Sequence, residues 1–265
     1  MRWAAVGALL GAAVAVIVFA PAAWLAGAVN SATGERLLLA DARGTVWRGS
    51  AVMVLTGGPG SRDASALPGR LDWVLSLDGA ALGVRARQDC CISGELRLRV
   101  VPGLNRIRVE LPGKVSAQGG SPEVIGHWPA SWLVGLGTPW NTLQPSGLLQ
   151  LSSPGLMVEQ VQGRWRFNGQ AELALNAMAS RLSTLPVLGS YRLNLSADEA
   201  SGDAARVQLR TDSGALQLSG SGAWAAAKFR FNGQASAAPG FEAALGSLLN
   251  IIGRRQGAVS LISIG

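Results

Sequence analysis

The stretch Glu95–Leu111 reads ELRLRVVPGLNRIRVEL and decides the fold class. In Glu95–Val100 leucine and valine alternate with arginine and glutamate, and the alternation returns in Arg106–Leu111. A period of two residues is typical of a β-strand with one apolar and one polar face. Because Pro102–Asn105 forms a turn between the two runs, the stretch predicts an antiparallel hairpin whose glutamates face arginines.

The same pattern extends over most of the chain. Glycine-rich breaks separate the runs, and the 35 glycines and 12 prolines follow no fixed period. Two short helices are predicted at 127–136 and 241–252, the second with an apolar face. The prediction is a mainly β fold, a long twisted antiparallel sheet that is curled rather than closed. Its other strands are expected at 35–41, 51–56, 71–77, 147–151, 165–171, 190–197, 205–211, 214–219, 229–235 and 259–264.

The hexapeptide RFNGQA occurs twice, at Arg166–Ala171 and Arg230–Ala235. Such a repeat favours stacked β-hairpins in one sheet. The Asn-Gly pair inside each copy indicates either a turn or a β-bulge. Alternation predicts that the aromatic residues of both copies share one face and that the arginines point to solvent. The aromatic residues are Trp165, Phe167, Phe229 and Phe231, and the arginines are Arg166 and Arg230.

The first 30 residues differ from the rest, because no charged side chain lies between Trp3 and Gly34. A membrane-spanning helix needs roughly 20 apolar residues. We therefore expect a single transmembrane anchor in residues 1–30 and one body in residues 31–265. The alternative is a cleaved signal peptide, but its apolar region is about 7–15 residues long. Both interpretations export the body, and Arg2 favours an amino terminus in the cytoplasm.

Charge and chemistry exclude several classes of function. The net charge is +7, and arginine supplies almost all of the 23 basic side chains. These are spread along the strands without a dense cluster, so no nucleic-acid binding is expected. His127 is the single histidine, and the chain has no P-loop, Rossmann fingerprint or G-x-S-x-G elbow. We therefore predict no catalytic residue, metal site or cofactor, and a protein that is not an enzyme.

The two cysteines, Cys90 and Cys91, are adjacent. In an oxidising compartment they could close a vicinal disulfide with a structural role. The alternatives are two reduced thiols or bonds to other chains.

Three tryptophans, Trp128, Trp132 and Trp140, lie in one short segment that breaks the strand pattern. They are candidate contacts for a partner protein. The other interpretation is a helix that plugs one end of the sheet.

Five tracts of the sequence are distinctive, and the rarest motifs in them are Trp-Pro and Thr-Pro-Trp-Asn. The tracts are Ala42–Ala51, Trp128–Leu133, Leu136–Leu143, Leu188–Tyr191 and Ile252–Arg255. Together they resemble the type II secretion system protein N family (general secretion pathway protein N). The resemblance implies an inner-membrane component of the secretion machinery, single-pass, with a periplasmic β-rich body that contacts other secretion proteins of the inner membrane and periplasm. It supplies no catalytic residue.

A second hypothesis belongs to another class, an envelope protein that binds or transfers lipid. The apolar face of a curled sheet could hold an acyl chain. A packed core and an open groove both alternate with period two, so the sequence leaves this alternative open.

Overall fold

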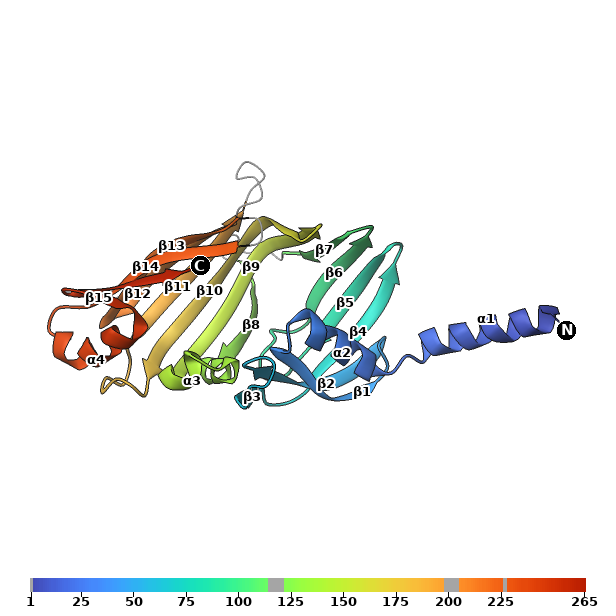
Figure 1. Ribbon diagram of the computed structural model, residues 1–265, viewed down its shortest axis with the longest axis horizontal. Coiled ribbons are helices and arrows are strands. Elements are labelled where there is room, and N and C mark those ends of the chain that lie inside the picture. The colour runs from blue at the N-terminus through green and yellow to red at the C-terminus, as the bar shows by residue number, and fades with distance from the viewer. Residues whose placement is uncertain (1, 114–121, 198–204, 226–227) are drawn as a thin grey trace.

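The computed structural model describes residues 2–113, 122–197, 205–225 and 228–265 (Figure 1). Their strands form one 16-stranded antiparallel sheet in the order β1-β2-β4-β5-β6-β7-β9-β10-β11-β12-β13-β14-β16-β15. β3 pairs with β2, and β8 pairs with β9. Along the main path the order follows the sequence up to β14, and then β16 lies between β14 and β15. The sheet is therefore mostly a meander of stacked hairpins, as the sequence predicts.

The strands before residue 114 form the first part of the sheet, on the right of Figure 1, and the later strands form the second part. The first part contains β1 (Leu37–Gly44), β2 (Arg48–Thr56), β3 (Ala64–Ala66), β4 (Leu71–Asp78), β5 (Ala81–Arg87), β6 (Leu96–Gly103) and β7 (Arg106–Leu111). The second part contains β8 (Val124–Pro129), β9 (Pro145–Val161), β10 (Arg164–Ser180), β11 (Gly189–Ala197), β12 (Ala205–Gly214), β13 (Leu216–Ala225), β14 (Lys228–Ala237), β15 (Arg254–Gln256) and β16 (Val259–Ile264).

The amino-terminal segment forms two helices, α1 (Arg2–Val18) and α2 (Ala22–Ala32), instead of the single helix that the sequence predicts. Pro21 separates them because it lacks an amide hydrogen and disfavours a helical conformation at the residue before it. α1 projects from one end of the sheet (Figure 1), and Trp3 is 89% exposed on it. None of the described helices is long and apolar enough to cross a membrane.

Two clusters of apolar side chains lie on one face of the sheet. The smaller cluster contains Ala22 of α2 with Ala51 and Trp73 of β2 and β4. The larger cluster fills one end of the second part, where α4 (Glu242–Ile252) buries Leu245, Leu248 and Leu249. This helix confirms the prediction for 241–252, although Phe241 precedes the helix and is 40% exposed.

The opposite face carries ion pairs between neighbouring strands. Glu110 stands opposite Arg99 across the β6–β7 hairpin, as predicted. Glu95 contacts Arg97, two residues along the chain, and Arg87 of β5, both at 2.8 Å. The hydrogen bond from Arg97 holds the pKa of the Glu95 carboxyl below its usual range. Glu159 of β9 is the most buried charged side chain of the described residues, at 7% exposed. It accepts hydrogen bonds from Arg108 at 3.1 and 3.2 Å.

The two RFNGQA copies lie in equivalent places, on β10 of the β9–β10 hairpin and on β14 of the β13–β14 hairpin. Neither Asn-Gly pair is a turn. Gly169 has a φ of +105° beside the bulge of β9, whereas Gly233 continues a regular ladder. Ring contacts from Phe167 through Trp224 to the second copy put its phenylalanines on the same face. Arg166 and Arg230 are exposed, as predicted.

The helix predicted over 127–136 begins later than expected. Trp128 lies on β8 and pairs with Leu149 of β9. Pro129 explains the difference, because the residue before a proline is disfavoured in the helical region. After it the chain forms a 3₁₀ helix, η1 (Ala130–Leu136), and a short helix, α3 (Trp140–Leu143).

Candidate interaction surfaces

Residues 130–143, which we call the end plug, join the two parts of the sheet at one end (Figure 1). Gly135 lies so close to β2 that a Cβ there would come within 2.4 Å of the Leu55 carbonyl oxygen. On α3, the side-chain amide of Asn141 donates a hydrogen bond to the Asp63 carboxylate at 3.1 Å. On the other side, Ala130 is fully buried in the larger cluster. The end plug is therefore a structural bridge, and glycine at 135 is required by the close approach.

The structure distributes the three candidate tryptophans over the end plug and the strand before it. Trp128 packs from β8 against the larger cluster. Trp132 lies on η1, and its indole Nε1 is buried without a hydrogen-bond partner among the described residues. Trp140 begins α3. All three are partly buried, so they form part of the end of the sheet and do not make one protruding knob.

Two more of the family-like tracts meet the end plug at the same end of the molecule. Leu188 and Tyr191 are 5% and 3% exposed in the cluster that also contains Ala130. Burial raises the pKa of the Tyr191 hydroxyl. Ile252–Arg255 leads from α4 into β15, where Arg255 pairs with Ser260 of β16. Four of the five tracts thus gather at one end, although they are far apart in the sequence.

The fifth tract, Ala42–Ala51, forms hydrogen bonds to the backbone at the junction between α1 and α2. The Trp47 indole donates a hydrogen bond to the Ile17 carbonyl oxygen at 2.8 Å. The Val46 amide donates one to the Ala20 carbonyl oxygen at 2.8 Å, and Trp73 donates to the Val46 carbonyl oxygen at 3.0 Å. This tract therefore fixes the place where the apolar helix leaves the sheet.

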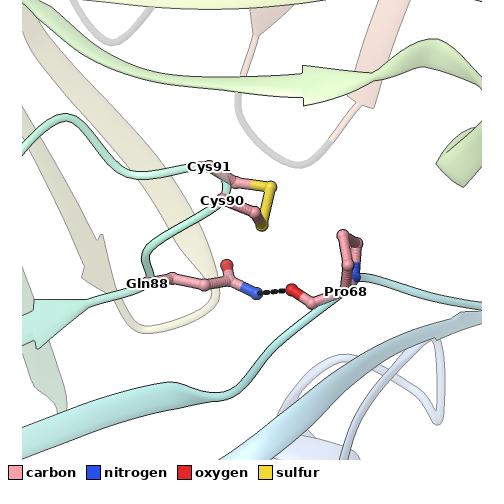
Figure 2. The surroundings of a disulfide bond; sticks show 4 residues. All are labelled: Pro68, Gln88, Cys90 and Cys91. Atoms are coloured by element: carbon pink, nitrogen blue, oxygen red, sulfur yellow. Dashed lines mark hydrogen bonds between the residues drawn. A yellow bond between two sulfur atoms is a disulfide. The ribbon is translucent and has the colours of Figure 1, made fainter.

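Cys90 and Cys91 form a disulfide in the loop between β5 and β6 (Figure 2). Beside them the Gln88 side-chain amide donates a hydrogen bond to the Pro68 carbonyl oxygen at 3.4 Å, as the figure shows. The loop pairs with β8, because the His127 amide donates to the Cys91 carbonyl oxygen at 2.8 Å. Cys91 is 2% exposed. The loop is thus, after the end plug, a second contact between the two parts of the sheet.

A third feature is a partly exposed apolar strip on the sheet, which we call the central apolar face. The sequence predicts an apolar face but leaves open whether it is a packed core or an open groove. The central apolar face consists of the inward-facing residues of β5, β6, β7 and the adjoining part of β9, which stand in register across the strands. All of them are partly exposed. The described helices pack elsewhere, on β1–β3, β9 and β14–β16. The residues are Leu82, Val84, Leu98, Val100, Val109 and Val158.

Metal-ligating side chains do not gather in the described part of the chain, where no group of three or more His, Cys, Asp or Glu is placed to hold an ion. The single histidine, His127, is exposed on β8.

The comparison with known protein families agrees with this arrangement. The model of the family "Type II secretion system (T2SS), protein N" matches residues 35–261, which include every strand from β1 to β15 and half of β16. No curated protein and no solved structure is detectably similar to the chain. The matched segment covers most of the sequence and all five tracts, so the chain belongs to the type II secretion system protein N family.

Proposed function

We propose that this protein is an assembly component of the type II secretion machinery without catalysis, held at the inner membrane by α1, with its sheet in the periplasm. Family membership supports a role in secretion. The exposed apolar side chains of α1 support the anchoring, among them Leu10 at 63% and Ile17 at 59%. The hydrogen bond from the Trp47 indole to the Ile17 carbonyl oxygen supports a fixed attachment of the sheet to that anchor.

The end plug is the proposed contact with other secretion proteins. The observation that carries this proposal is the gathering of four family-like tracts at one end of the sheet. A bridge that only stabilised the fold would not need partly exposed tryptophans, because aromatic side chains are enriched where proteins contact one another. Trp132 and Trp140 are the residues proposed to reach the partner.

Secretion assays test this function in two steps. Deleting residues 31–265 while keeping the anchor should impair export of folded periplasmic substrates. Trp132→Ala and Trp140→Ala together should then impair export, in a variant whose circular dichroism spectrum shows that it is still folded at the temperature of the assay. Leu104→Ala is the matched control, because Leu104 is 99% exposed and lies outside the end plug. Normal export in the double variant would contradict the proposed contact.

A second candidate function is supported by the central apolar face. Apolar strips in soluble proteins are normally covered, and a partly exposed strip that crosses several strands marks a binding surface. We propose that it holds the acyl chains of an envelope lipid. Solvent extraction of the purified full-length protein, followed by mass spectrometry, should find phospholipid in stoichiometric amounts. A protein that carries none, and that takes up none when offered, would refute this second function.

A further inference from the structure

Three arginines stand in one row across the first part of the sheet, on the face that carries the ion pairs. Arg48 of β2 is in register with Val74 of β4, and Val74 with Arg85 of β5. Arg85 in turn stands opposite Arg97 of β6. Because side chains alternate along a strand, these residues lie on the face opposite to Trp73 and the smaller cluster. All three arginines are exposed, and we call them the arginine row.

The arginine row carries positive charge that the fold does not neutralise. Arg97 contacts Glu95 at 2.8 Å, whereas Arg48 and Arg85 form no ion pair in the described part of the chain. Like charges that stand directly opposite on neighbouring strands destabilise a sheet, and Arg85 faces Arg97 in this way. A local rule that is broken without compensation inside the fold indicates a functional surface, here one for an anionic partner.

An open hollow of about 710 Å³ lies against the arginine row. Arg48 and Arg85 line it, together with Val74 between them. Two strand spacings put the backbones of these arginines about 10 Å apart, so both long side chains can reach one anionic group. The carboxylates of Asp72 and Asp89 also border the hollow, but neither pairs with an arginine of the row among the described residues.

The arginine row begins where α1 meets the sheet. The β1–β2 turn, which directly precedes Arg48, donates hydrogen bonds of 2.8 Å to the carbonyl oxygens of Ile17 and Ala20 at the junction of α1 and α2. Phe19 is 74% exposed and Trp24 is 58% exposed beside this junction, from which α1 projects (Figure 1). Exposed aromatic side chains at the end of an apolar helix are typical of the boundary between a bilayer and water. The row therefore starts at the level where α1 would leave a membrane.

We propose that the arginine row lies on the surface of the bilayer that α1 enters and binds the anionic headgroups of its phospholipids. The inference rests on the anchoring by α1 in the first proposed function and adds a contact between the sheet and the membrane surface. Arginine suits this contact, because its guanidinium group can donate two parallel hydrogen bonds to one phosphate. An acidic protein would also match the charge, but it would not explain why the row starts at the end of α1.

Phenylglyoxal, which modifies exposed arginines, tests the contact in the full-length protein. The protein is reconstituted into vesicles of phosphatidylcholine alone and into vesicles of equal parts phosphatidylcholine and phosphatidylglycerol, and peptide mass spectrometry follows each arginine. Arg48 and Arg85 should react about fivefold more slowly in the anionic vesicles at low salt, because proximity to an anionic surface favours a bound arginine by about that factor. High salt should remove the difference. Arg206 and Arg230 are exposed in the second part of the sheet and should react equally in both vesicles.

A charge variant tests the same contact through stability. The anionic vesicles should raise the melting temperature of the parent protein above its value in phosphatidylcholine, because a ligand that binds only the folded sheet stabilises it. Arg48→Gln/Arg85→Gln should lose this shift. The matched control Arg206→Gln/Arg230→Gln removes the same charge from another place and should keep it. Circular dichroism in phosphatidylcholine vesicles confirms that both variants are folded.

The failures of the contact and of the anchor are distinguishable. A protein that a carbonate wash removes from the vesicles would refute the anchoring by α1, and this inference with it. A protein that stays in the vesicles, but whose Arg48 and Arg85 react equally in both, would refute the membrane contact alone. Equal protection by inorganic phosphate in phosphatidylcholine vesicles would show a site for a free anion and overturn the proposal. Protection by polyglutamate but not by phosphatidylglycerol would assign the arginine row to an acidic protein instead.

Discussion

Tyr191→Phe tests how tightly the end of the sheet is packed. Tyr191 is the only tyrosine of the chain and is 3% exposed. Its hydroxyl is buried and has no hydrogen-bond partner among the described residues. A buried polar group without a partner costs about 1–3 kcal/mol, and phenylalanine keeps the ring. We therefore expect the free energy of unfolding at pH 7 to rise by about 1 kcal/mol.

The same substitution should change the alkaline stability. Burial raises the pKa of the Tyr191 hydroxyl. Below about pH 10 the hydroxyl is protonated in both the folded and the unfolded chain and contributes no pH dependence. Above that pH only the unfolded chain releases its proton, so the free energy of unfolding falls by up to about 1.4 kcal/mol per pH unit. The phenylalanine variant should lack this component.

Guanidinium unfolding between pH 7 and pH 11 measures both effects, and the difference between the two proteins cancels every other titrating group. Tyrosinate absorbance gives an independent readout, because a single side chain produces it. The signal should appear only as the protein unfolds. An ordinary tyrosinate titration near pH 10 in the folded protein, or a less stable phenylalanine variant, would refute the reasoning.

Three further substitutions follow from the sheet. Glu159→Gln should lower the free energy of unfolding by about 1–3 kcal/mol in denaturant melts, because the half-exposed guanidinium of Arg108 loses its buried partner; a change within error would show that this pair is not stabilising. Phe231→Ala should lower the free energy of unfolding by about 3–5 kcal/mol, since the ring is 7% exposed and lies against glycines of the neighbouring strand. Phe167→Ala should lower it by less, because Phe167 is only partly buried. Equal losses of stability in the two variants would contradict this difference in burial. Replacing Cys90–Cys91 by two serines should shift the melting temperature only modestly, because an adjacent pair closes almost no loop; a large shift would give the disulfide a greater role.

The sequence predicts strands best where alternation is local and uninterrupted. Val259–Ile264 and Arg106–Leu111 have the predicted bounds. The facing in β16 differs from simple alternation, because Ser260 is buried and donates a hydrogen bond to the Leu249 carbonyl oxygen, while Leu261 is 40% exposed. β5 was missed, since alanine and glycine weaken its alternation. β9 is far longer than its predicted core of 147–151, because Ser153 and Gly155 interrupt the pattern at a bulge that the sheet absorbs.

Features that depend on contacts between distant residues could not be predicted. Nothing near Trp128 in the sequence indicates that β8 pairs with both β9 and the Cys90–Cys91 loop. The five family-like tracts are short sequence motifs, and the sequence does not indicate that they lie close together. Four of them meet at one end because of the topology of the sheet. The exposure of the central apolar face could not be predicted either, because alternation is the same for a covered and an uncovered strand.

The dimensions of the sheet explain why cover is needed at its centre. Fourteen strands in the main order, at about 4.8 Å each, span roughly 65 Å. α2 and α4 have 11 residues each and are about 16 Å long, so each can cover about three or four strands. The end plug covers one end only. The described helices therefore leave the apolar side of β5–β7 without a second layer, at a cost of about 25 cal/mol for each Å² of apolar surface left in water. Lipid chains on the central face would remove that cost without contact to the end plug, so the two proposed functions use different surfaces and can operate in the same molecule.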